Sequence, residues 1–177
     1  MSAQLFDLAI RLVLRHEGGF SNNAKDPGGM TNLGVTQRTW EVHTGKSASE
    51  ADMRALTQEA VQPVYKARYW NTIHGDDLPH GVDYCLFDCA VNSGPGRAVK
   101  LAQYVLHQKV DGSLGKNTLA AIKAADPVEL IEDYSQRRLD FLKSLDTWPT
   151  FGKGWGKRVS EVELEAKAFS RNGSMLA

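Results

Sequence analysis

The sequence predicts a mainly α-helical fold that is interrupted in its first half by a small glycine-rich hairpin or loop. Apolar side chains recur at the three- and four-residue spacing of amphipathic helices in most segments. Residues 18–36 differ, because they hold five glycines and Pro27 and few long apolar side chains. The proportions of hydrophobic residues, 42%, and charged residues, 24%, agree with a globular chain rather than a disordered or fibrous one.

The first helix is expected over residues 4–16, and the two glycines after Glu17 should end it. Its apolar positions share one face of a helix. They are Leu5, Phe6, Ala9, Ile10, Val13 and Leu14. Glu17 therefore stands where an apolar helix meets a glycine turn.

Capping residues predict where the next helices begin. Ser47 and Glu50 have the spacing of a capping box, which predicts a helix over roughly 48–55. Thr57 should start another helix, with a kink or a late start at Pro63. Other helices are expected over 37–44, 97–108, 117–125, 127–145 and 157–169.

Residues 81–92 are expected to be almost wholly buried and to form the central helix of the core. Cys85 and Cys89 lie within it, four positions apart, and we expect two small buried side chains rather than a metal site or a disulfide. The composition shifts at Gly94–Gly96, the best candidate for a boundary inside the chain.

Charge and hydropathy exclude several partner classes. The chain has 21 basic and 21 acidic residues and a formal net charge of zero, so we expect no nucleic-acid partner. No run of about eighteen apolar residues exists, so we expect no membrane insertion. The N-terminus lacks a positive region followed by an apolar stretch, which predicts synthesis in the cytoplasm without a signal peptide.

Two carboxyl groups, Glu17 and Asp26, are expected to have different surroundings. Glu17 at the end of an apolar helix should be partly desolvated, which favours the protonated acid, whereas Asp26 on a hydrated loop should stay ionised. Glycoside hydrolysis uses one protonated acid and a second polar group across the scissile bond. Spacing alone leaves a second interpretation open, in which Glu17 only ends a helix and Asp26 only starts a turn before Pro27.

Two nearby segments carry a more specific signal. The segment His16–Phe20 reads HEGGF, and the segment Asp26–Thr36 reads DPGGMTNLGVT. Together they resemble the signature of glycoside hydrolase family 108, which comprises N-acetylmuramidases of phages, prophages and bacteria. The resemblance implies a lysozyme-like fold with Glu17 as the catalytic acid. It also implies cleavage of the bond between N-acetylmuramic acid and N-acetylglucosamine in peptidoglycan.

The spacing of Glu17, Asp26 and Thr31 also resembles the catalytic constellation of phage-type lysozymes. Eight residues separate Glu17 from Asp26, as in those enzymes, whereas four rather than five separate Asp26 from Thr31. The resemblance implies that Asp26 acts as a base or positions water and that Thr31 helps to hold that water. It favours inversion at the sugar carbon, and retention remains the alternative.

Later segments extend the resemblance over most of the chain. Two are similar to further parts of the family, one to the turn of peptidoglycan-binding modules, and one to the end of a C-terminal peptidoglycan region. They are Tyr65–Trp70, Phe87–Gly94, Val110–Thr118 and Phe151–Arg158. We therefore expect a catalytic region over 1–93 and a helical peptidoglycan-associated region over 94–177, packed on it.

Three further side chains are candidates for substrate binding. Tyr69 and Trp70 could stack on sugar rings, although aromatic residues at helical spacing also suit a core. Asn92 could hydrogen-bond an N-acetyl group, although it also suits the end of a helix.

The resemblance predicts a monomeric, endolysin-like muramidase that needs no metal or organic cofactor and acts on the glycan strands of the cell wall after release. One alternative is a lytic transglycosylase with the same substrate. Another is a non-catalytic wall-binding or secretion-assisting protein that retains the fold.

Overall fold

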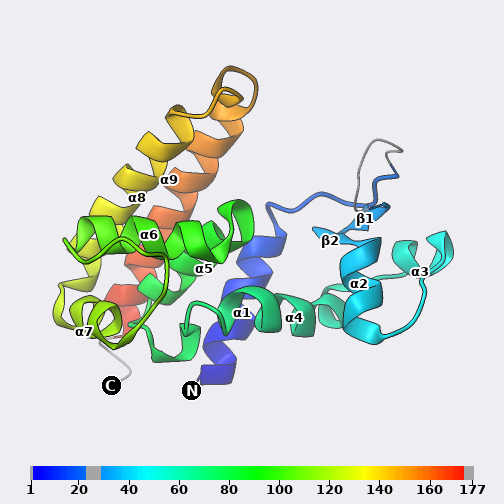
Figure 1. Ribbon diagram of the computed structural model, residues 1–177, viewed down its shortest axis with the longest axis horizontal. Helices are drawn as coiled ribbons and strands as arrows, with labels where there is room; N and C mark the ends of the chain where they lie inside the picture. The colour runs from blue at the N-terminus through cyan, green and yellow to red at the C-terminus, as the bar shows by residue number, and fades with distance from the viewer. Residues whose placement is uncertain (1, 23–28, 174–177) are drawn as a thin grey trace.

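The computed structural model describes residues 2–22 and 29–173 and has the mainly α-helical fold that the sequence predicts. Figure 1 shows α1 (Ser2–Leu14) between two groups of elements. The smaller group holds β1 (Thr31–Asn32), β2 (Val35–Thr36), α2 (Gln37–Thr44) and α3 (Glu50–Arg54). The larger group holds α5 (Val82–Ser93), α6 (Pro95–Val105), α7 (Lys116–Ala124), α8 (Pro127–Lys143) and α9 (Trp148–Gly173).

A continuous helical segment connects the two groups. It consists of α4 (Gln58–Tyr65) and the π-helix η1 (Lys66–Trp70), and the 3₁₀ helix η2 (Gly75–Asp77) follows. Thr57 caps α4, since its hydroxyl accepts a hydrogen bond from Ala60 N at 3.2 Å. Pro63 lies inside α4, so the helix does not start late. Instead the backbone widens into η1 three residues after the proline.

The expected glycine-rich hairpin is present. Strands β1 and β2 are antiparallel, and Thr31 pairs with Thr36 and Asn32 with Val35. Leu33 and Gly34 between them have φ of 49° and 71°. Positive φ at both central residues is the signature of a tight two-residue turn that suits the twist of a hairpin.

Helix α3 begins with a capping box that lies two residues later than the one we expected. The expected pair was Ser47 and Glu50, but Ser49 is the N-cap and Asp52 its partner. The Ser49 N–H donates to Asp52 Oδ2 at 2.8 Å, and Asp52 N–H donates to Ser49 Oγ at 3.2 Å. Both pairs of residues have the same spacing, and the pair at which the helix starts makes the bonds.

Helix α9 is longer than expected. The sequence predicts a helix over 157–169, yet residues 148–156 already form the first turns of α9. Glycine is unfavourable inside a helix, but here it makes room for a ring. A Cβ atom on Gly152 would lie 2.5 Å from the Trp148 ring. Packing of the indole over the glycine therefore outweighs the poor helix propensity.

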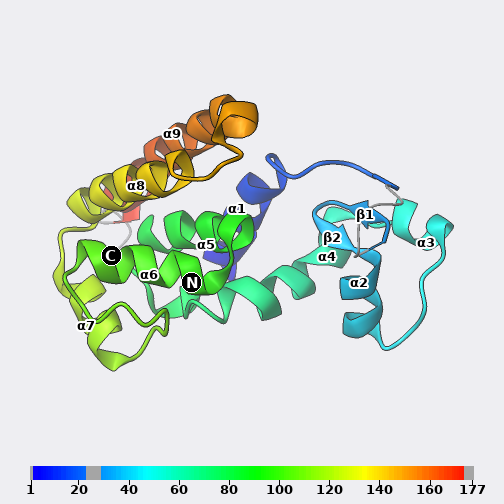
Figure 2. The ribbon, with the colours of Figure 1, turned by 45° about the horizontal axis from the view of Figure 1, so that its top comes forward.

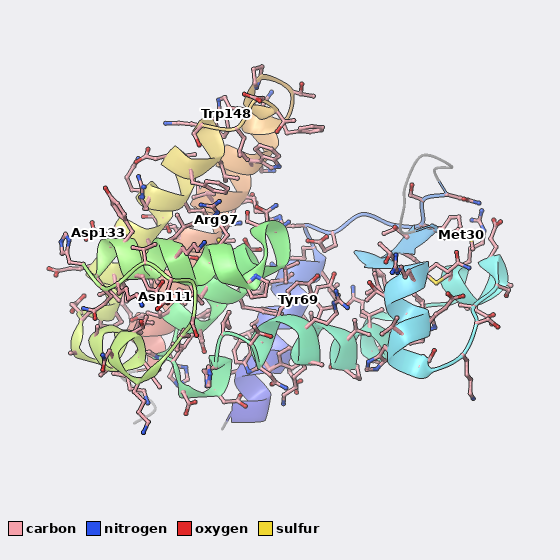
Figure 3. The ribbon with its side chains drawn as sticks, in the orientation of Figure 1. Met30, Tyr69, Arg97, Asp111, Asp133 and Trp148 are labelled. Carbon is pink, nitrogen blue, oxygen red and sulfur yellow. The ribbon has the colours of Figure 1, made fainter. Side chains whose placement is uncertain are left out.

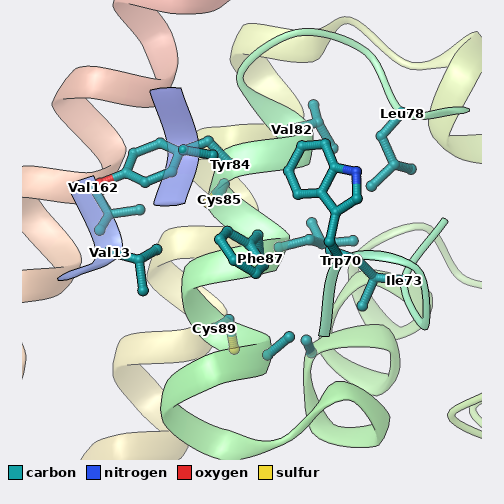
Figure 4. Close-up of a cluster of buried hydrophobic side chains, with 14 of the residues drawn as sticks. Val13, Trp70, Ile73, Leu78, Val82, Tyr84, Cys85, Phe87, Cys89 and Val162 are labelled. Atoms are coloured by element: carbon teal, nitrogen blue, oxygen red, sulfur yellow. The ribbon is translucent and has the colours of Figure 1, made fainter. Parts of the chain in front are cut away.

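The core is built around α5, which confirms the central helix expected over 81–92. Every residue of α5 from Val82 to Ala90 is buried. Figure 4 shows side chains of this helix together with Val13 of α1, Trp70 of η1 and Val162 of α9. Cys85 and Cys89 are buried, free thiols within this cluster.

Helices α8 and α9 run side by side as an antiparallel pair in both Figure 1 and Figure 2. Contacts between α9 and α5 connect this pair to the core. The expected boundary at residue 94 falls between α5 and α6, which pack on each other. Within the described ranges, no helix has the length and apolar character needed to cross a membrane.

Candidate active site

The carboxyl group of Glu17 lies just beyond the last residue of α1. The backbone N–H groups of Arg15, His16 and Glu17 donate to the carbonyls three residues earlier, at 3.2, 3.0 and 3.3 Å. These bonds tighten the helix end into a 3₁₀-like turn before the glycines. The Glu17 side chain is 19% exposed, so it is largely removed from water while still reaching the surface.

The hairpin turn lies against one oxygen of Glu17. A Cβ atom on Gly34 would lie 2.8 Å from Glu17 Oε2 and 2.3 Å from Tyr65 Oη. Only glycine leaves room for both groups at this position, where φ is also positive. Tyr65 Oη donates to the carbonyl of Leu33 at 2.9 Å. Burial, and then the charge of Glu17, raises the pKa of Tyr65, so this phenol remains a neutral donor.

A distant helix supplies the group that touches the other oxygen of Glu17. Arg158 of α9 donates from Nη1 to Glu17 Oε1 at 3.1 Å, although the two stand 141 positions apart in sequence. The same guanidinium binds Asp88 of α5 from its other side. Its Nε lies 3.0 and 3.2 Å from the two Asp88 oxygens, and its Nη2 lies 2.8 Å from Oδ1.

Asp88 is fully buried and faces two guanidinium groups. Arg138 of α8 places Nη1 2.7 Å from Asp88 Oδ2, as an ion pair that lacks the alignment of a hydrogen bond. Burial opposes ionisation of Asp88, but the charges of Arg138 and Arg158 outweigh it and hold the pKa below its usual range. Arg138 Nη2 also donates to Asn92 Oδ1 at 3.4 Å. Side chains from α1's end, α5, α8 and α9 thus form one charged cluster.

The other two residues expected to be catalytic are only partly described. Asp26 lies outside the residues that the structure describes. Thr31 begins β1, and its backbone pairs with Ser21 through bonds of 2.7 and 2.8 Å. Its hydroxyl oxygen is buried and has no hydrogen-bond partner among the described residues.

The two aromatic residues proposed for sugar contact have different surroundings. Trp70 is 0% exposed, packs edge-on against Phe6 and Phe87, and donates from Nε1 to Asp76 at 2.9 Å. No ring face remains for a sugar, so its placement corrects the expectation of stacking. Tyr69 is half-buried, with its ring 5.6 Å from that of Tyr65. Figure 3 shows it near the middle of the molecule.

Asn92 belongs to the charged cluster through Arg138, and it also accepts a hydrogen bond from Ser93 Oγ at 3.1 Å. Sequence reasoning missed Asp88, Arg138 and Arg158. A partial signal did exist for Asp88, because an aspartate inside a buried helix needs hydrogen-bond donors or a charged partner. Nothing in the sequence identified which arginines would supply that partner.

The described residues bring together no group of three or more histidine, cysteine, aspartate or glutamate side chains that could hold a metal ion. The cluster around Glu17 instead combines two carboxylates with two guanidinium groups. Arginine has only donors, so Glu17 Oε1 accepts from Arg158, and Oε2 is the oxygen that lies beside the hairpin turn at Gly34.

Comparison with known proteins identifies the family of this chain. The sequence model of the family described as glycosyl hydrolase 108 matches residues 10–94. Among solved structures, that of Brucella abortus SagA is 44% identical, with a TM-score of 0.81, and the alignment covers 94% of this chain and 95% of SagA. Among curated proteins, no match was found. The chain therefore belongs to the glycosyl hydrolase 108 family.

Proposed function

We propose that this glycoside hydrolase is an N-acetylmuramidase that cleaves peptidoglycan between N-acetylmuramic acid and N-acetylglucosamine, with Glu17 as the general acid. The observation that carries the proposal is the placement of the Glu17 carboxyl. It stands at the end of an apolar helix, with Oε1 bound by Arg158 and Oε2 beside the hairpin turn at Gly34. A half-buried carboxyl held in this way suits proton donation to a leaving oxygen.

The second group of the reaction would come from the hairpin side. We assign Asp26 the role of base or water-positioning residue, with Thr31 helping to hold that water. The buried Thr31 hydroxyl, which has no partner among the described residues, supports this assignment. Inverting glycosidases separate their two carboxyl groups by about 6.5–9.5 Å, which leaves room for the water. We propose inversion on the basis of the lysozyme-like spacing of these residues.

Substrate contacts are proposed for Tyr69, which keeps part of its side chain accessible, and for Asn92 at the edge of the charged cluster. Residues 94–177 are proposed to contact peptidoglycan as well. We further propose that the protein acts as a monomer on the cell wall after release from the cytoplasm, as endolysins do.

The direct test replaces Glu17 by glutamine, which keeps the size of the side chain but removes the transferable proton. We expect clearance of bacterial walls to slow by ~10²–10⁴-fold, the usual cost of losing a general acid. Circular dichroism should show an unchanged fold. A folded variant that clears walls at the wild-type rate would remove Glu17 from this role.

The products distinguish the related mechanisms. Mass spectrometry should find reducing N-acetylmuramic ends, whereas anhydro-muramic ends would identify a lytic transglycosylase. Proton NMR of the first sugar released should show the α-anomer, whereas an initial β-anomer would mean retention and would exclude Asp26 as a base. Wall binding without either product would indicate a non-catalytic protein.

A further inference from the structure

We propose that Arg158 is a positioning residue for Glu17, so that helix α9 completes the active site from outside the segment that matches the family. This inference rests on the proposed role of Glu17 as the acid. It concerns how the acid is held, and it makes the C-terminal helices part of the catalytic machinery in addition to any contact that they make with the wall.

The guanidinium of Arg158 is fixed on one side and directed on the other. Two of its nitrogens, Nε and Nη2, bind Asp88 at 2.8–3.2 Å. The third, Nη1, reaches Glu17 Oε1 at 3.1 Å. A planar guanidinium that is held by a two-point contact has little freedom to rotate, so Nη1 keeps its direction.

The anchor itself is rigid. Asp88 is fully buried in α5. Arg138, which is 1% exposed, pairs with Asp88 Oδ2 at 2.7 Å. Both residues sit in long, packed helices, α5 and α8. Glu17 itself stands on a short turn beyond α1. The contacts from Arg138 through Asp88 and Arg158 to Glu17 therefore hold the acid in a fixed place relative to the core.

This arrangement has two chemical consequences. Because Arg158 can only donate, it keeps Oε1 as an acceptor and leaves Oε2 to carry the proton beside the hairpin turn. As Glu17 gives up that proton, negative charge develops on its carboxyl group. The guanidinium is already in place to stabilise that charge without reorganisation.

A second arginine pair provides a matched control. Arg15 stands two residues before Glu17 and pairs with Glu165 of α9 at 3.4 Å, with 66% and 34% of the two side chains exposed. It joins the same two parts of the chain as Arg158 does, but it is not among the contacts of Glu17. Arg15→Gln therefore removes an equivalent connection without touching the acid.

The experiment measures kcat and KM on soluble peptidoglycan fragments for Arg158→Gln, Arg158→Lys and Arg15→Gln. We expect Arg158→Gln to lower kcat by ~10²–10³-fold, the loss typical of a donor that stabilises developing charge, with KM little changed. Arg158→Lys keeps the positive charge and should recover part of kcat. The recovery should be incomplete, because one ammonium cannot span both carboxylates. Arg15→Gln should behave like the wild type. Arg158→Gln leaves Asp88 paired with Arg138, which protects folding.

A double-mutant comparison separates positioning from general structural support. In a Glu17→Gln background, Arg158→Gln should change neither the residual rate nor the affinity for fragments, because the residue through which it acts is already gone. If Arg158→Gln unfolds, Arg158→Lys takes its place in the same comparison.

Two results would overturn the inference: a kcat for Arg158→Gln equal to that of Arg15→Gln, or a loss of fragment affinity that persists in the Glu17→Gln background. A fully active Glu17→Gln single variant would instead contradict the proposed function, so the two failures are distinguishable.

Discussion

Two buried aspartates of helix α5, one in its first turn and one in its middle, have opposite preferences for charge. Near its start, Asp83 accepts only backbone N–H groups, from Gly81 at 2.8 Å and Tyr84 at 2.7 Å, and burial raises its pKa to about 7. In the middle of the helix, Asp88 faces two guanidinium groups, which outweigh burial and lower its pKa. Burial is nearly complete at both sites, so the partners decide the charge.

The two aspartates also differ in how far away in sequence their partners lie. The partners of Asp83 lie within two residues of it, and its bonds serve the first turn of α5. The partners of Asp88 lie 50 and 70 residues away in sequence, in α8 and α9, and one of them reaches Glu17. Asp88 is therefore the point of α5 at which the C-terminal helices meet the candidate active site.

Replacing Asp88 should have the largest effect on stability. Asp88→Asn leaves two buried guanidinium groups without their carboxylate, and breaking a buried pair in this way costs ~3–5 kcal/mol. Arg158 also loses its anchor, so wall clearance should fall together with stability. Urea denaturation followed by circular dichroism measures the free energy of unfolding.

The matched comparison for this prediction is Asp83→Asn, which removes the other buried carboxyl of the same helix. We expect Asp83→Asn to keep wall-clearing activity. Equal losses of stability and activity in the two variants would contradict the prediction. They would mean that burial of the carboxyl, and not its guanidinium partners, causes the losses.

Asp83 should give stability a pH dependence of the opposite sign to that of an ordinary paired carboxylate. Its pKa is about 7 in the folded protein, against about 4 in an unfolded chain, so the folded state binds the extra proton between these values. Stability from this group is present below pH about 4 and is lost as the pH rises through about 7. Asp83→Asn should remove that loss and be more stable at pH 8 by roughly 1–3 kcal/mol.

Thermal unfolding of the wild type and Asp83→Asn between pH 4.5 and 8 measures this difference. Asp126→Asn serves as a control, because Asp126 caps α8 through the same kind of bonds, 2.9 Å from Val128 N and Glu129 N, but is exposed. Melting curves of the wild type and Asp83→Asn that stay parallel across this range would show that Asp83 does not titrate there.

Local patterns in the sequence predicted most of the fold. The apolar spacing located α1 and α5, Thr57 marked the start of α4, and the glycines marked the hairpin. The first turns of α9 were missed because the helix there depends on the packing of Trp148 over Gly152, which no propensity reveals. Local rules succeed where neighbours in sequence are also neighbours in space.

The candidate site could be predicted only in part, for the same reason. Glu17 and the glycine turn that faces it lie within one short stretch of sequence, so a motif can carry them. Arg158 reaches Glu17 from 141 residues away, and its direction depends on Asp88 in a third helix. The local trace of this arrangement is Asp88, one of two aspartates within a buried helix.

The smallest expected effect tests whether the start of α5 is also connected to the site. Tyr84 donates from Oη to Glu165 of α9 at 3.0 Å, and its ring packs edge-on against Phe169 at 5.7 Å. Tyr84→Phe keeps the ring and loses one hydrogen bond. Glu165 is 34% exposed and keeps Arg15 as a partner, so the loss should be about 1 kcal/mol.

Wall clearance by Tyr84→Phe should stay at the wild-type rate, because its hydrogen bond to Glu165 and its ring contact with Phe169 lead to α9 without passing through Arg158 or Glu17. The urea midpoint should shift with an unchanged slope, which indicates a change of stability alone. A loss of activity as large as that of Asp88→Asn would mean that the start of α5 supports the acid as well as its middle. In that case the distance from Arg158 to Glu17 would depend on the whole α5–α9 interface, and no single guanidinium could be assigned the positioning role.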